Sequence, residues 1–304
     1  MTQISKLIGL HAQTSIHAGT GQNTGVIDLP IQREGHNGWP CIFGSAVKGA
    51  LRSRAEEKYD KDSGSVIYVF GETTEKGNEQ AGAIAISDAR LLLLPVRSLT
   101  SQFKWVTCPA VLQRLAQDAS RFASHVLTVN DLSVLDENLG EEQAFVDNSH
   151  SENEKLFLEE YRFQAKPIAL EVIIEAILPF MNGVSKATLA EQLVIVSNDN
   201  FTYIAEHATP VNAHIAIESE TKVVKPGALW YEETLPPETI LYIGLSAVKS
   251  RHKREKGKED IGISAERVMG AITDLFSERA WLQLGGNETV GMGWCAVSIL
   301  DKSA

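Results

Sequence analysis

The residues most suited to chemistry lie in one stretch, residues 17–52, where glycines, a carboxylate and basic side chains follow one another. Glycines allow backbone amides to approach a ligand closely, and Asp28 stands among apolar neighbours just after several of them. A helix is expected to begin at Ser45, which places Lys48 in its first turn. A helix N-terminus with a nearby lysine attracts phosphate. The stretch therefore predicts a phosphate-binding site with a carboxylate able to act on the bound group.

Three known motifs are absent or incomplete in this stretch. The glycines Gly19, Gly21 and Gly25 miss the spacing of a dinucleotide-binding loop by one residue. No Gly-Lys-Ser/Thr sequence is present, so a nucleotide P-loop is excluded. Ser45-x-x-Lys48 matches the start of the penicillin-recognising site, yet neither Ser-Asp-Asn nor Lys-Thr-Gly follows. The eight histidines show no metal-ligand spacing.

Length and composition are those of a globular protein, with 304 residues, 43% hydrophobic and 22% charged. No apolar run approaches the ~20 residues of a membrane span, and the N-terminus lacks a secretory signal pattern. Cys41, Cys108 and Cys295 are an odd, widely spaced set, which argues against a disulfide framework or a zinc site. We therefore expect a cytoplasmic protein that does not enter a membrane.

The charge balance bears on nucleic-acid binding. The formal net charge is −11, whereas a free-standing, non-specific RNA binder is usually basic. Acidic residues gather at 136–160 and basic residues at 249–258. RNA binding would therefore require basic groups concentrated on one face, away from the acidic excess.

The apolar patterns predict an α+β fold. Strands are expected at 4–12, 66–70 and 168–178 without a regular strand–helix–strand alternation. The acidic segment 123–166 is interpreted as an insertion outside the central sheet, and the alternation in 214–224 predicts a hairpin. Helices are expected at 45–59, at 109–122, at 185–193 from Ser185, at 199–206 from Asn198, and at 264–279.

Several long motifs in order give the chain a family resemblance. Residues 25–34 (GVIDLPIQRE) and 40–52 (PCIFGSAVKGALR), with 87–98, 227–233 and 285–293, resemble the RAMP superfamily. More narrowly, they are similar to the repeated backbone subunits of the type III-B CRISPR effector, the Cmr complex. The resemblance runs almost end to end. It implies one RAMP domain over the whole chain, built on a ferredoxin-like (RRM-like) palm.

The resemblance also implies two appendages and a set of partners. The finger-like insertion corresponds to about 123–166, and a thumb-like β-hairpin to about 207–235. The partners are a CRISPR guide RNA, a target RNA, further copies of the chain in a filament and other Cmr subunits. The implied function is cleavage of complementary target RNA at regular intervals. A non-catalytic structural backbone and a phosphometabolite-binding enzyme remain as alternatives.

The resemblance makes Asp28 the catalytic candidate, because this aspartate is implicated in target cleavage in the family. A carboxylate near a scissile phosphate can hold Mg²⁺ or Mn²⁺ or accept the proton of the attacking 2′-hydroxyl. The alternative is an aspartate that stabilises a turn. His17, eleven residues earlier, is a candidate general acid, or else a structural histidine.

Three further acidic residues are candidates for the same chemistry. Asp88 is a second acid, or one half of a buried ion pair with Arg90. Glu232 and Glu233 would lie at the base of the thumb hairpin, where they approach the target strand.

Binding to RNA is expected from three regions of the chain. The first helix would hold guide phosphates, unless its basic residues form only a solvated face. The hairpin aromatics would stack on a base or pack internally. The C-terminal glycine-rich loop, a hallmark of the resembled family, would follow an RNA backbone through its amides. The residues concerned are Lys48, Arg52, Arg54, Trp230, Tyr231, Gly285, Gly286, Gly291 and Gly293.

Overall fold

A computed structural model describes residues 3–60, 63–72, 81–122, 126–135, 139–152, 154–251 and 262–300. The strands are β1 Ile4–Ala12, β2 Cys41–Ile42, β3 Ile84–Ile86, β4 Ala89–Arg97, β5 Phe103–Thr107, β6 Gln143–Asp147, β7 Lys155–Leu158, β8 Tyr161–Ile168, β9 Leu193–Ile195, β10 Val211–Ile217, β11 Val224–Glu233, β12 Ile240–Ala247, β13 Trp281–Gln283 and β14 Trp294–Leu300. The helices are α1 Gly44–Tyr59, α2 Gly64–Phe70, α3 Pro109–Arg121, α4 Glu171–Ile177, α5 Lys186–Gln192, α6 Asn198–His207 and α7 Ala265–Asp274, with short 3-10 helices η2 Val129–Leu135, η3 Leu178–Phe180 and η4 Glu288–Val290.

A mixed α+β fold is built on one large sheet, as expected. At its centre, β14, β1, β12 and β4 lie side by side, and each neighbouring pair is antiparallel. Helix α1 lies in the connection from β1 to β4, and α7 lies in the connection from β12 to β14. The expected strand at 4–12 is confirmed as β1, which pairs Ile8 with Ile243 on one side and with Ile299 on the other.

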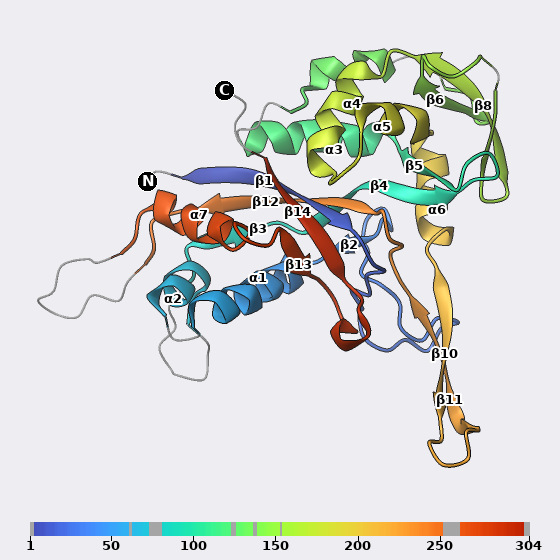
Figure 1. Cartoon of the computed structure of the whole chain (residues 1–304). Coiled ribbons are helices and arrows are strands. Elements are labelled where there is room, and N and C mark those ends of the chain that lie inside the picture. The colour runs from blue at the N-terminus through green and yellow to red at the C-terminus, as the bar shows by residue number, and fades with distance from the viewer. Residues whose placement is uncertain are drawn as a thin grey trace, which may run out of the picture.

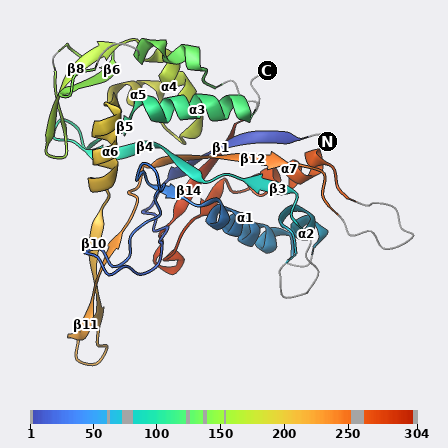
Figure 2. The same ribbon diagram turned by 180° about the vertical axis from the view of Figure 1, so that it is seen from behind.

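Helices cover both faces of the central strands. In Figures 1 and 2, α1, α2 and α7 lie on one face, and α3, α4 and α5 lie on the other. A strand covered on both faces is apolar on both, rather than alternating. Residues 91–94 of β4, four consecutive leucines, are accordingly all buried.

Two expected strands are helices. Residues 66–70 belong to α2, whose first turn is capped by Ser63 accepting from the Val66 amide. In 168–178, β8 ends at Ile168 and α4 follows, with Ile173, Ile174 and Ile177 buried at helical spacing. A short apolar run does not distinguish a buried strand from a buried helix by periodicity alone, and these two predictions were wrong for that reason.

The segment 123–166 is not separate from the sheet. Within its described residues, β6 pairs with β8 in parallel, β7 pairs with β8, and Phe145 of β6 pairs with Ile195 of β9. The strands therefore extend the large sheet beyond β5 and β9. The acidic composition that suggested an outlying insertion comes mainly from the connections, while β6 buries residues 144–146.

Helix starts agree with expectation at some positions and differ at others. Ser185 caps α5 as predicted, by accepting from the Thr188 amide. The cap of α6 is Ser197 rather than Asn198. Helix α1 begins at Gly44, before Ser45, and no side chain of its own N-cap residue holds it. The charged loop at 249–260 lies mostly outside the described residues.

The predicted hairpin is confirmed as β10 and β11, which project away from the sheet (Figure 1). Direct pairs such as Ile215 with Leu229 place one set of side chains on one face of this ribbon. The hairpin carries exposed apolar residues at Val211, Ile215, Ile217, Val224 and Leu229. None of the described helices is long and apolar enough to cross a membrane.

Candidate active site at the root of the hairpin

Asp28 lies where the first glycine-containing loop runs beside the root of β11. The loop behaves as a short extra strand: the Leu29 amide donates to the Tyr231 carbonyl at 3.1 Å, and the Glu233 amide donates to the Leu29 carbonyl at 3.0 Å. Next to the first of these bonds, Asp28 Oδ2 accepts from the Tyr231 amide at 2.8 Å. No further partner of this carboxylate is found among the described residues. One oxygen is thus fixed by the backbone, and the other is left for a ligand.

His17 is held against the same root from the opposite end of the loop. Its Nδ1 lies 2.8 Å from the Glu233 carbonyl oxygen, so Nδ1 must donate, because a carbonyl only accepts. The Nε2 atom therefore remains for proton exchange. It faces Gly19, where an added Cβ would lie only 2.6 Å from it. Glycine at position 19 keeps that side of the imidazole clear.

Glu232 links the hairpin to the C-terminal glycine-rich loop. Its side chain is only 4% exposed, and Oε1 accepts from Asn287 Nδ2 at 2.5 Å. The same oxygen lies 3.5 Å from His17 Nδ1. Oε2 lies 3.9 Å from His214 Nε2, a buried nitrogen without a hydrogen-bond partner. Glu232 thus joins His17, His214 and Asn287 in one polar cluster.

Glu233 has a different environment although it is the next residue. Its Oε1 accepts from Arg33 Nη2 at 2.5 Å and from the Thr209 hydroxyl at 2.6 Å. Its Oε2 accepts from the Ile31 amide at 3.1 Å. Both oxygens are therefore used to fasten the segment after Asp28 to the hairpin. This geometry is that of a structural anchor.

Asp88 belongs to another part of the molecule. Its Oδ1 accepts from the Gly44 amide at 2.7 Å, so it caps the N-terminus of α1 from a distant part of the chain. Arg90 does not pair with it, because Arg90 Nη1 contacts Asp118 Oδ2 at 2.6 Å. The alternative interpretation, an Asp88–Arg90 ion pair, is therefore wrong, and no contact of Asp88 with Asp28, His17 or Glu232 is found among the described residues.

The basic residues of α1 separate into different environments. Arg52 contacts Glu56 at 2.8 Å and the Gly71 carbonyl at 3.0 Å, which commits it to the fold. Lys48 is half-buried and has no ion pair or hydrogen bond among the described residues. Arg54 points to another flank of the helix, where it pairs weakly with Glu57. Lys48 is the best placed of the three to hold a phosphate.

The remaining RNA-binding candidates also lie in different environments. Trp230 stacks on His214, with ring centroids 5.4 Å apart, so it packs within the hairpin. Tyr231 is exposed on the opposite face. Gly285 requires its residue type, because its φ is +85° and an added Cβ would lie 2.4 Å from the His17 carbonyl. Gly286 donates its amide to that carbonyl at 2.8 Å, and Gly293 donates to the Ser15 carbonyl at 2.8 Å.

Sequence reasoning missed the residues that organise this cluster. Asn287 and His214 act on Glu232, and Arg33 and Thr209 act on Glu233. Asn287 left a signal, since it follows two glycines and takes the left-handed conformation that asparagine tolerates. Arg33 lies within the motif at 25–34, although its role was not indicated there. His214 and Thr209 lie in segments without such a motif.

Thiol chemistry does not enter the site. Burial raises the pKa of Cys41 to about 12, and the neighbouring Glu34 and Asp88 charges act in the same direction. Burial likewise raises the pKa of Cys108 and of Cys295 to about 12. A thiol with such a pKa stays protonated near neutral pH and is a poor nucleophile.

Asp28 is the candidate metal ligand of this site. Among the described residues, no group of three histidine, cysteine, aspartate or glutamate side chains forms a metal cluster. Asp28 Oδ1 has no hydrogen-bond partner within the described part of the chain. Such a carboxylate fits an ion whose other ligands are phosphate oxygens and water, as is common for Mg²⁺.

The arrangement described above, a large mixed sheet with a glycine-rich C-terminal loop packed on the first loop, has known counterparts. The sequence model of the RAMP superfamily matches residues 10–296. The chain therefore belongs to the RAMP superfamily.

Within that superfamily, its similarity is to the Cmr4 proteins. It is 35% identical over 300 residues to the Cmr endoribonuclease Cmr4 of Pyrococcus furiosus, covering 97% of this chain and 95% of that protein. It is 24% identical to the CMR subunit Cmr4 of Saccharolobus solfataricus over 93% of this chain and 92% of that one.

Solved structures agree with this placement. A crystal structure of oligomeric Cmr4 from Pyrococcus furiosus superposes with a TM-score of 0.71 at 26% identity over 99% of both chains. A cryo-EM structure of the type III-B Cmr-beta complex bound to cognate target RNA has a chain of the same fold, with a TM-score of 0.73 at 20% identity over 97% of both chains.

Proposed function

We propose that this chain is a guide-RNA-binding backbone subunit of a type III-B CRISPR complex in the cytoplasm, and that it cleaves complementary target RNA with Asp28. Similarity to a protein named as the Cmr endoribonuclease supports this proposal. The observation that carries it is the Asp28 carboxylate, with Oδ2 fixed to the Tyr231 amide and Oδ1 without a partner in the described structure. A turn-stabilising aspartate would need only the first of these features.

The proposed reaction uses the 2′-hydroxyl of the target as nucleophile. The 2′-oxygen attacks the adjacent phosphorus while Asp28 accepts its proton. The bond from phosphorus to the 5′-oxygen breaks, and the leaving oxygen takes a proton from a general acid. The products are a 2′,3′-cyclic phosphate and a 5′-hydroxyl. Base pairing with the guide supplies specificity, and the protein holds the backbone.

His17 is the proposed general acid, acting through Nε2. The bond from Nδ1 to the Glu233 carbonyl fixes the orientation of the imidazole. Glu232 Oε1 lies 3.5 Å from Nδ1 and borders the imidazole on its hairpin side. We assign Glu233 a positioning role, because its two oxygens are occupied by Arg33, Thr209 and Ile31.

A divalent ion, Mg²⁺ or Mn²⁺, is part of the proposal. Asp28 would hold it through a water of its shell, and RNA phosphate oxygens and further waters would complete that shell, so that Asp28 Oδ1 stays free to accept the 2′-hydroxyl proton. When bound, the ion supplies charge neutralisation at the phosphate. Cleavage that proceeds at the full rate in excess chelator would contradict this part of the proposal alone.

The finer architecture is also a proposal. The order β14–β1–β12–β4, with α1 and α7 in the two long connections, supports a ferredoxin-like palm. The β10–β11 ribbon would be the thumb and 123–166 the finger. Copies would associate head to tail along the guide, which requires two different complementary surfaces on each copy.

The test assembles the complex with guide RNA and the other Cmr subunits, using either the natural chain or Asp28→Ala. End-labelled complementary target and Mg²⁺ are added, and the products are sized on a gel. We expect a regular ladder that Asp28→Ala abolishes while target binding persists. Asp199→Ala, an exposed carboxylate on α6, is the matched control and should cut normally.

The same assay separates the alternatives. Binding without cleavage in both forms identifies a structural backbone. Equal cleavage by the natural chain and by Asp28→Ala would mean that another residue carries out the cleavage. Failure of the natural chain to bind RNA would leave the phosphometabolite alternative.

A further inference from the structure

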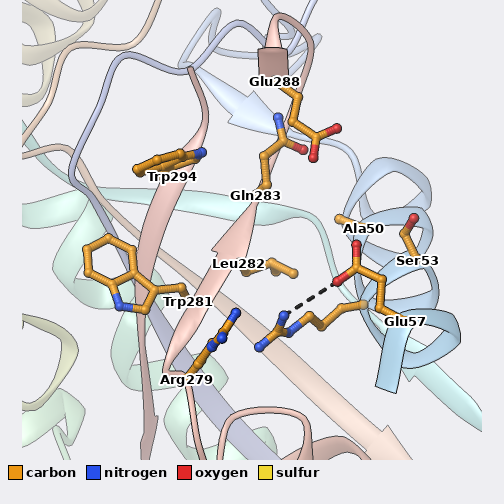
Figure 3. A pocket seen from close by; sticks show the side chains of 10 residues that line it. Ala50, Ser53, Glu57, Arg279, Trp281, Leu282, Gln283, Glu288 and Trp294 are labelled. Atoms are coloured by element: carbon orange, nitrogen blue, oxygen red, sulfur yellow. Dashed lines mark hydrogen bonds and ion pairs between the residues drawn. The ribbon is translucent and has the colours of Figure 1, made fainter. Parts of the chain in front are cut away.

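A pocket of about 580 Å³ opens between α1 and the edge of the sheet formed by β13 and β14. Figure 3 shows Trp281 and Trp294 on the sheet side and Ser53 and Glu57 on the helix side. The pocket is separate from the Asp28 site, since none of its lining residues contacts Asp28 in the described structure. A cavity of this size accommodates a small ligand or one nucleotide.

Two exposed indoles dominate one wall of this pocket. In the β13–β14 pairing, Gln283 lies opposite Trp294, and Trp281 lies two residues before Gln283, so all three side chains share one face. Trp281 is 46% exposed and Trp294 is 50% exposed. Trp39, by contrast, is buried in the core. Large aromatic surface left open beside a cavity is typical of a binding site.

Basic side chains complete the pocket. Arg279 is exposed and has no ion pair among the described residues. Arg54 contacts Glu57 at 3.5 Å, a weak exposed pair that is easily exchanged for another anion. Arg54 is six residues beyond Lys48, about 120° around the helix axis from it. The pocket thus lies on a different flank of α1 from Lys48.

We propose that this pocket binds one unpaired RNA nucleotide, with its base stacked on an indole and its phosphate against Arg279 and Arg54. The proposal rests on the proposed RNA-binding function and adds a second contact surface to it. Stacking on aromatic side chains with arginine nearby is how proteins hold single strands without reading sequence. The pocket also borders the glycine-rich loop through Glu288, so a strand following that loop reaches the indoles.

Glu288 gives the pocket a feature that can be tested separately. It has no ion pair among the described residues, and its carboxylate repels a phosphate at the pocket mouth. Glu288→Gln removes that charge while keeping the side-chain size. The substitution is therefore expected to tighten RNA binding, by about two- to threefold at low salt.

The test titrates the full chain with a single-stranded RNA oligonucleotide of guide length and follows tryptophan fluorescence. We expect quenching that falls when Trp281 and Trp294 are each changed to phenylalanine, because the quenched indoles are then absent. The double variant Trp281→Ala/Trp294→Ala should bind RNA about tenfold or more weakly. Leu99→Ala, another exposed apolar side chain, is the control and should bind normally.

Two outcomes overturn the proposal, and they differ from failure of the proposed function. If the double variant binds RNA normally but no longer self-associates in light scattering, the pocket is a protein interface. If RNA binds with no change in the fluorescence of Trp281 or Trp294, the nucleotide lies elsewhere. If the natural chain binds no RNA, the proposed function itself fails, and this proposal falls with it.

Discussion

The root of the β10–β11 hairpin and the pocket beside α1 differ in how firmly their side chains are held. At the root, Glu232 and Glu233 are buried, and three of their four carboxylate oxygens accept from protein donors at 2.5–3.1 Å. In the pocket, the indoles and Arg279 are exposed and hold few partners. Chemistry at one phosphate needs atoms held in place before the substrate arrives. Contact with an RNA of any sequence needs broad, adaptable surfaces.

The largest effect is expected from removing Glu233, which fastens the segment after Asp28 to the root of the hairpin. Glu233→Ala removes the carboxylate partner of Arg33, which keeps only carbonyl and hydroxyl acceptors, and the acceptor of the Thr209 hydroxyl. Loss of one partner of a buried ion pair costs about 3 kcal/mol. We expect the midpoint of urea unfolding to fall and target cleavage to be lost with it. Glu220→Ala, at the exposed hairpin tip, is the control for the same residue type. Unchanged stability in Glu233→Ala would show that the anchor is not needed.

A subtler change tests whether the glycine-rich loop positions the root. Asn287→Gly removes the amide bonded to Glu232 and suits the left-handed backbone at that position. Cleavage should fall about tenfold with little change in RNA affinity. Asn287→Asp should be worse, because it sets a second carboxylate beside Glu232. Single-turnover rates measure both variants, and an Asn287→Asp variant as active as the natural chain would refute the positioning role.

Smaller effects are expected from substitutions in helix α1, where Lys48 and Arg52 have different environments. Lys48→Ala should weaken RNA binding several-fold and lower the slope of log affinity against log salt by about one, because one phosphate contact is lost. Arg52→Ala should instead lower stability by about 1 kcal/mol and leave the salt slope unchanged, since its partners are Glu56 and Gly71. Salt titrations of RNA binding measure the slope for both variants, and urea unfolding measures their stability. If Arg52→Ala lowered the salt slope and Lys48→Ala lowered stability instead, Arg52 would be the phosphate contact and Lys48 the structural residue.

Local patterns predicted much of the fold. The apolar strand at 4–12, the helix at 109–122 and the hairpin are all confirmed, because each is encoded in adjacent residues. The segments 66–70 and 168–178 were wrong, because a short buried run carries no decisive period. The sheet strands within 123–166 were missed because acidic residues flank them and β7 has only four residues.

The site was predictable as a set of candidates but not as an arrangement. The motif at 25–34 indicated Asp28 as a candidate. The sequence did not indicate that Glu232 and Glu233 would have different partners. That difference depends on Asn287 for one and Arg33 for the other, which tertiary folding brings to the hairpin. Asp88 was a candidate because it is an acidic residue beside Arg90 at the end of an expected strand, and its cap on Gly44, 44 residues away, was not visible in the sequence.

The central claim is that the charge of Asp28, rather than its shape, carries the chemistry. Asp28→Asn tests this most directly, because the amide oxygen can still accept from the Tyr231 amide and hold the loop. Cleavage rates and target affinity would be measured for the assembled complex. We predict unchanged affinity and a cleavage rate lowered at least about 100-fold. Cleavage by Asp28→Asn at the natural rate would contradict the account.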